Sequence, residues 1–197
     1  MNDIQFEAFS LYAGMRMDGM SKLDAFMWTV KCLLPEEEYP NGYDDGAIEL
    51  YSWLRETTKL KVKARKAWSV PERHLARAAI DFALGELDLG ISPVPITVYL
   101  KGKHETDFGD SVDLGHKVVI RINKTKNWLQ TLFHELEHAR QYIYCELELE
   151  TDHVIWRGTL SARDSENYEE YWNSPWEVAA REKEEELFAA FQKNLLT

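Results

Sequence analysis

Two histidines and a glutamate in the second half of the chain have the spacing of a metal-binding motif. They lie in the run His-Glu-Leu-Glu-His, where His134 is followed by Glu135 and, four residues on, by His138. Histidines at this spacing share one face of an α-helix, so their imidazole nitrogens can bind one ion. Zinc accepts such ligands, and a catalytic site leaves one position for water. Glu135 would lie beside the ion and take a proton from that water. The motif therefore predicts a zinc site that hydrolyses amides.

The same five residues could also be a pair of surface histidines on a charged helix. Glu137 and Arg140 favour that interpretation, because they indicate a solvent-exposed side. The uncharged residues 131–133 just before the motif favour a helix that lines a core. We expect a helix over 126–148 whose buried stripe and metal-facing side are distinct. The buried stripe would hold Leu129, Leu132, Leu136 and Ile143, and the neighbouring face Thr131, His134, His138 and Cys145, the last as a small buried residue rather than a ligand.

A tetrahedral zinc site needs a third protein ligand. The residues five and six positions after His138 are Ile143 and Tyr144, where SprT-like proteases and metzincins respectively carry a histidine. A glutamate on a following helix is the remaining common solution, as in gluzincins. Glu177 is the best candidate, because it begins a helical stripe (177, 180, 184, 187, 191) that should face the core. An unpaired carboxylate would be costly there, and a metal ion would compensate for it.

Two alternatives to this third ligand remain open. Ser174 and Glu177 have the spacing of a capping box, in which the glutamate bonds to the serine amide and needs no metal. His153 is the only other histidine after the motif and is the alternative ligand.

The reaction would also need a group that stabilises an oxyanion. Between the motif and the last helix, four residues could approach the metal, and Tyr171 is our candidate among them. The four are Tyr168, Tyr171, His153 and Arg157, whereas His74, His104 and His116 are expected to be ordinary surface or core histidines.

The remaining pattern indicates an α+β protein. We expect an all-helical region over residues 1–70, of unknown role, followed by a metal-binding domain over 71–197. The expected helices are 3–14, 21–34, 47–68, 71–90, 126–148 and one from 174 almost to the C-terminus. The expected strands are 96–102, 116–123 and 153–161, and residues 35–46 are expected to be a loop.

Composition narrows the class of protein. The chain is 45% apolar and 12% aromatic, which is typical of a folded protein. It has no run of ~18 apolar residues and no start resembling a signal peptide, so we expect a cytoplasmic protein without membrane partners. Cys32 and Cys145 form no metal-binding pair and fit a reducing compartment. The net charge of −11 disfavours general attraction to nucleic acid.

The charge is unevenly distributed along the chain. The segment Lys59–Arg77 holds seven lysines or arginines and one acidic residue, Glu72, for a charge of +6. A solvated helix face would explain this segment. Contacts with nucleic-acid phosphates would also explain it, provided that the cations share one exposed face.

Three stretches of the chain carry a resemblance to a known family. They are HELEHARQY (134–142), WRG (156–158) and YWNSPWEVAARE (171–182). Together they resemble the HExxH metallopeptidases encoded by tailed bacteriophages, over about residues 95–190. The resemblance implies a zincin-like fold, in which a small sheet backs the active-site helix, and a host cytoplasmic location. It also implies that His134, His138 and Glu177 bind Zn²⁺ and that Glu135 is the catalytic base.

Three functions are therefore to be compared. The first is a zinc metallopeptidase that acts on a protein or peptide substrate. The second is a structural or regulatory zinc protein without turnover, against which Glu135 argues, since a structural site needs no base and is normally closed by cysteine. The third is a nucleic-acid-associated protein that docks through the basic segment.

Overall fold

The computed structural model describes residues 3–18, 20, 22–33, 59–92, 94–103, 108–150, 152–162 and 167–196. The chain divides into two compact units, and the predicted α+β class is confirmed. One unit comprises Met1–Lys59 with Gly90–Pro93, and the other comprises Leu60–Leu89 with Val94–Thr197. In the described part of the chain, no helix combines the length and the hydrophobicity that crossing a membrane requires.

The described residues of the first unit form two helices, α1 (Asp3–Met17) and α2 (Lys22–Leu33). They pack on each other, and small and aromatic side chains such as Ala8, Tyr12 and Ala25 are buried. Both helices were predicted. The loop expected over 35–46 and the first part of the helix expected over 47–68 lie outside the described residues.

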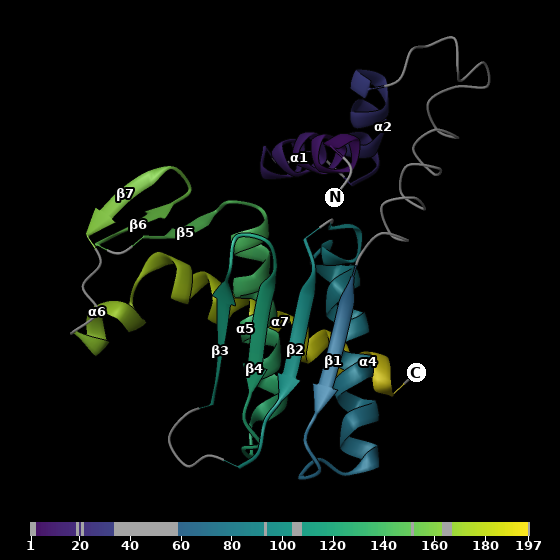
Figure 1. The fold of residues 1–197 in the computed structure, drawn as a ribbon, viewed down its shortest axis with the longest axis vertical. Coiled ribbons are helices and arrows are strands. Elements are labelled where there is room, and N and C mark those ends of the chain that lie inside the picture. Colours follow the sequence, from purple (N-terminus) through teal and green to yellow (C-terminus); the bar gives the residue numbers. More distant parts are fainter. Residues whose placement is uncertain are drawn as a thin grey trace. The chain divides into compact units, whose positions relative to one another are not determined.

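The second unit is built on a four-stranded sheet with the strand order β1-β2-β4-β3 (Figure 1). β1, β2 and β4 are parallel, and β3 is an antiparallel edge strand beside β4. The strands are β1 (Leu60–Ala64), β2 (Ile96–Leu100), β3 (Gly109–Asp113) and β4 (Val118–Ile122).

Two of these strands correct the sequence-based prediction. The helix expected over 47–68 is wrong at 60–64, where Leu60 and Val62 alternate with lysines and the strand pairs with β2. Five residues with this alternation are too short to distinguish a strand from a basic helix without their partner. β3 was missed because its sequence, Gly-Asp-Ser-Val-Asp, has almost no apolar pattern and depends on pairing with β4.

Three helices cover one face of the sheet (Figure 1). The buried side chains of β2 and β4, such as Val98 and Ile120, belong to the core. Phe82, Phe133 and Phe191 join the helices through ring contacts with centroids 5.4–6.4 Å apart. The helices are α4 (Val70–Glu86), α5 (Trp128–Ile143) and α7 (Pro175–Leu195). A short 3₁₀ turn, η2 (Leu89–Ile91), follows α4, so the helix predicted over 71–90 ends earlier than expected.

The region between α5 and α7 departs most from the prediction. The helix expected over 126–148 ends at Ile143, and Cys145 is exposed with a φ of 55°, so its expected burial is wrong. The single strand expected over 153–161 is a hairpin, in which Arg157 and Gly158 both have positive φ, as a two-residue type I′ turn requires. The elements here are β5 (Leu147–Leu149), β6 (His153–Trp156), β7 (Thr159–Ala162) and α6 (Tyr168–Trp172).

Gly109 allows the edge strand to approach α5 closely. A Cβ atom at this position would lie 2.9 Å from both the Arg121 carbonyl oxygen and the Thr131 Cγ2 atom.

We expect Gly109→Ala to lower the free energy of unfolding by about 1–3 kcal/mol through overpacking, measured by chemical denaturation. Gly85→Ala in α4 is the matched control, because no atom lies within 4 Å of its added Cβ. That variant should be neutral or more stable by up to about 1 kcal/mol. Equal stability of the two variants would contradict the close approach of β3.

A candidate metal centre between two helices

Three side chains from α5 and α7 bring one donor atom each to the same place. His134 and His138 lie one turn apart on α5, and Glu177 lies in the first turn of α7, after the N-cap Ser174 and the first helical residue Pro175. The Nε2 atoms of the two histidines are 3.1 Å apart. Glu177 Oε2 lies 3.3 Å from His134 Nε2, and Glu177 Oε1 lies 3.2 Å from His138 Nε2.

These separations fit a tetrahedral metal site. Four ligands at ~2.0–2.1 Å from a zinc ion lie about 3.3 Å from one another, which is close to the distances above. Glu177 is only 2% exposed, and its Oε1 atom accepts no hydrogen bond although it faces His138. A buried carboxylate oxygen in that state is stabilised by a cation. Within the described residues, these three side chains form the one group of this kind, and they are the three predicted ligands.

The alternatives to Glu177 as third ligand do not fit the structure. The Ser174 side chain makes no capping hydrogen bond, and the Glu177 carboxylate is turned towards the histidines, so the capping-box interpretation is wrong. His153 lies on β6, where its Nδ1 atom is 2.8 Å from the exposed Asp152 carboxylate, and it is not part of the donor group.

A buried glutamine holds His138 in a fixed orientation. Gln141 Nε2 donates to the Trp176 carbonyl on α7 over 3.1 Å, so Gln141 Oε1 must accept from His138 Nδ1–H, at 2.8 Å. This bond leaves the lone pair on His138 Nε2, which faces Glu177. On the other histidine, Nδ1 lies 3.3 Å from Glu184 Oε2. Both partners could have been found from spacing, since Gln141 is three residues after His138 and Glu184 is on the predicted stripe of α7.

The electrostatics of the group favour bound positive charge. Burial opposes the charged form of His134, but its contacts with Glu177 and Glu184 outweigh burial and raise its pKa to about 10. Burial likewise opposes the charged form of Glu177, yet the two histidines hold the pKa of this carboxyl well below its usual range. Glu177 therefore stays ionised, and the group as a whole stabilises a cation.

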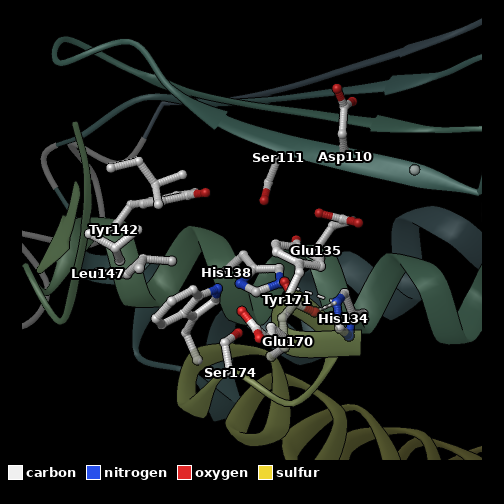
Figure 2. A pocket seen from close by; sticks show the side chains of 15 residues that line it. Asp110, Ser111, His134, Glu135, His138, Tyr142, Leu147, Glu170, Tyr171 and Ser174 are labelled. Atoms are coloured by element: carbon white, nitrogen blue, oxygen red, sulfur yellow. Dashed lines mark hydrogen bonds and ion pairs between the residues drawn. The ribbon is translucent and has the colours of Figure 1, made fainter. Parts of the chain in front are cut away.

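Glu135 lies beside the donor group without joining it. It is 7% exposed, and burial raises its pKa, although the two histidines oppose the shift. A hydrogen bond with Ser111 on β3 orients the carboxylate. Figure 2 shows Ser111 pointing from the edge strand towards this carboxylate. A carboxylate with a raised pKa, held next to a metal site, is suited to accept a proton.

A cavity of about 470 Å³ opens over the donor group (Figure 2). One side is formed by Gly109, Asp110 and Ser111 of the edge strand β3. The other side is apolar and includes Leu147, Val154 and Trp176, which pack together. The candidate metal group and Glu135 lie at the base, so the cavity can hold a substrate against them.

Two tyrosines reach this cavity. Tyr171 on α6 hydrogen-bonds to the Glu177 carboxylate, and burial together with this bond raises the pKa of its hydroxyl. Tyr142 interacts with Ser111 and was not anticipated, although it lies four residues after His138 on the same helix face. The other candidates point elsewhere: Tyr168 is 73% exposed and stacks on Trp172, and Arg157 pairs with Glu146.

The expected solvent-exposed side of α5 is wrong, because Glu137 and Arg140 belong to a largely buried ion network. Glu137 is 2% exposed and pairs with Arg140 at 2.8 Å. Arg140 also pairs with Glu146 at 2.7 Å, and Glu146 is 3.1 Å from Arg157 in the hairpin turn. The network ties α5 to β5 and the hairpin, which carry the apolar side of the cavity. Charged residues in a helix sequence therefore do not by themselves indicate a solvent-exposed face.

Comparison of the chain with protein-family models, with curated proteins and with solved structures finds no match. The geometry of the site is therefore the basis for any conclusion about the class of protein. That geometry is a group of two histidines and a glutamate, with a buried second glutamate beside it, at the base of a cavity.

Glu146 gives a test of the ion network that does not involve the metal group. Burial opposes its charge, but Arg140 and Arg157 hold the pKa of its carboxyl below the ordinary 4.5. Its stabilising contribution is therefore complete above about pH 4.5 and is lost as the pH falls through the lowered pKa. We expect Glu146→Gln to lower the free energy of unfolding at pH 7 by about 2–4 kcal/mol, with a smaller further loss on acidification than in the wild type.

Urea denaturation between pH 7 and pH 3 measures both effects. Glu148→Gln, at an exposed position of β5, is the matched control and should behave like the wild type. A wild-type-like pH profile of Glu146→Gln would contradict the role of the network.

Proposed function

We propose that this protein is a zinc-dependent metallopeptidase with a zincin-like domain. His134, His138 and Glu177 bind the Zn²⁺ ion, and Glu135 is the general base. The observation that carries the proposal is the convergence of the three donor atoms, all within 4.8 Å of one another, beside a buried glutamate at the base of a cavity.

The donor set favours a catalytic site over a structural one. Two imidazoles and one carboxylate are a common set for hydrolytic zinc, whereas structural sites are usually closed by four ligands that include cysteines. Cys32 and Cys145 are both exposed and are not part of the group. A zinc ion held here would lower the pKa of a coordinated water towards ~7.

Glu135 has the position and the environment of a general base. It follows the first ligand on α5, so its carboxylate projects about 100° around the helix from His134 and lies beside the donor group. It accepts a proton from the attacking water and donates it to the departing amine. Ser111 holds the carboxylate through its hydrogen bond, and the raised pKa of Glu135 strengthens it as an acceptor.

Tyr171 is our candidate for stabilising the oxyanion. The raised pKa of its hydroxyl keeps it protonated at neutral pH, so that it can donate a hydrogen bond. Its hydrogen bond with Glu177 supports this role, because it holds the hydroxyl beside the donor group, and Tyr171 also lines the cavity.

A peptide is the substrate class that best fits the cavity. Among the described strands, β3 pairs with β4 alone, so the backbone groups along its other side are available. Residues 109–111 of β3 also line the cavity, directly opposite the ligand helix. An extended peptide could add to this edge as a further strand, which would hold its backbone over the metal group. The apolar side of the cavity would accommodate a hydrophobic side chain.

The first test concerns the ligands. We expect the purified protein to bind about one zinc ion per chain, measured by elemental analysis and by competition with a chromophoric chelator. Glu177→Gln should weaken zinc binding at least about 100-fold, because an amide is a poor zinc ligand. Glu182→Gln, at an exposed position on the same helix, is the matched control and should bind zinc normally. Wild-type affinity in Glu177→Gln would exclude this ligand.

The second test separates catalysis from metal binding. Glu135→Gln should retain zinc and lose roughly 10²–10⁴ in the rate of peptide hydrolysis, because it removes the base while keeping the ligands. Cleavage of a mixed peptide pool, followed by mass spectrometry, gives the rate whatever the sequence preference of the protein. Near-normal turnover by this variant would place the base elsewhere, and zinc binding without any hydrolysis by the wild type would favour a structural site.

A further inference from the structure

The sheet has a second face that the active-site geometry does not use. α4, α5 and α7 all lie on one side of it (Figure 1), and no described helix of this unit lies on the other side. The strands alternate accordingly: Val98, Ile120 and Ile122 are buried, whereas Lys61, Lys63 and Arg121 are exposed. We call the surface that carries these exposed residues, together with Tyr99, the open face.

The strand register aligns cations with one aromatic ring on the open face. Lys63 is paired with Tyr99, and Tyr99 is paired with Arg121, so the three form a row across β1, β2 and β4. The Lys63 ammonium lies 5.5 Å from the centroid of the Tyr99 ring, and that of Lys101 lies 5.1 Å from it. Two ammonium groups therefore lie within 5.5 Å of the ring centroid.

A second cavity, of about 390 Å³, lies where the three parallel strands end. Four cationic side chains line it: Arg65, Lys101, Lys103 and Arg121. Among the described residues that line it, the one carboxylate is that of Asp110, which is paired with Arg121. Asp110 points away from the metal group on the opposite side of β3 from Ser111 (Figure 2). The open face and this cavity thus form a positive surface on a chain whose net charge is −11.

We propose that the open face binds single-stranded nucleic acid, with phosphates at the cations around the strand ends and a base stacked on Tyr99. A row of cations beside a ring is the combination that holds single strands, through phosphate contacts and base stacking. Exposed cation–π contacts are weaker than base stacking, so a base displaces a lysine from the ring. A duplex hides the faces of its bases, and an acidic peptide has no base to stack.

The experiment is a binding titration of the full chain with a fluorescently labelled 20-nucleotide oligo(dT), measured by anisotropy at several salt concentrations. Lys63→Gln/Lys101→Gln should weaken binding roughly tenfold and reduce the slope of log K against log salt by about 1.4, at about 0.7 per lost phosphate contact. Tyr99→Leu should weaken binding roughly fivefold or more through lost stacking, with an unchanged salt slope.

The matched control is Arg73→Gln/Arg77→Gln, which removes two positive charges from the same basic segment. Both arginines are exposed on α4, a helix on the other side of the sheet, so this variant should bind as the wild type does. An equal loss in the control would overturn the assignment to the open face. Equally tight binding of polyglutamate or of duplex DNA, or wild-type binding by both Lys63→Gln/Lys101→Gln and Tyr99→Leu, would overturn the single-strand assignment.

Discussion

A carboxylate buried between two helices is the constraint on which the candidate site depends. Glu177 is 2% exposed and faces two imidazoles on α5, so its charge requires compensation within the protein. The packing of α7 on α5 fixes this approach through the contact of Phe133 with Phe191 and the hydrogen bond from Gln141 to the Trp176 carbonyl. Any change that separates these helices would leave a buried, unpaired charge, which is strongly destabilising. The site therefore depends on the contacts that hold α5 and α7 together.

The two sides of the cavity are positioned from the same helix. β3 comes close to α5 because Gly109 has no side chain, and this brings Ser111 to Glu135. On the other side, Arg140 joins α5 to Glu146 and thereby to the hairpin beyond β5. α5 thus carries two of the donors and the proposed base. The edge strand and the apolar side of the cavity are both positioned against it. The positively charged side chains of the open face point away from this cavity. The proposed catalytic site and the proposed nucleic-acid surface therefore lie on opposite faces of the sheet.

The donor group could be predicted from the sequence because the patterns that indicate it are local. The spacing of His134 and His138 has meaning only on a helix, and the helix signal around them is strong. Glu177 could be inferred because a helix start and an apolar stripe coincide at it. β1 could not be recognised, since it depends on a partner strand far along the chain. β3 forms a hairpin with the next strand, β4, but its sequence has almost no apolar pattern of its own. The burial of Glu137 and Arg140 was also hidden, because it depends on Glu146 and Arg157 beyond the helix end. Contacts with other elements, rather than residue type, separate what could be predicted from what could not.

The most direct test of the account is the zinc K-edge X-ray absorption spectrum of the purified, zinc-loaded protein. A donor group of His134, His138 and Glu177 gives nitrogen and oxygen scatterers at ~2.0–2.1 Å, with the outer-shell pattern of two imidazoles. It gives no sulfur at ~2.3 Å, because Cys32 and Cys145 lie outside the group. We predict that spectrum for the wild type. A sulfur shell, or a spectrum without imidazole scattering, would show that zinc binds elsewhere and would contradict the proposed centre.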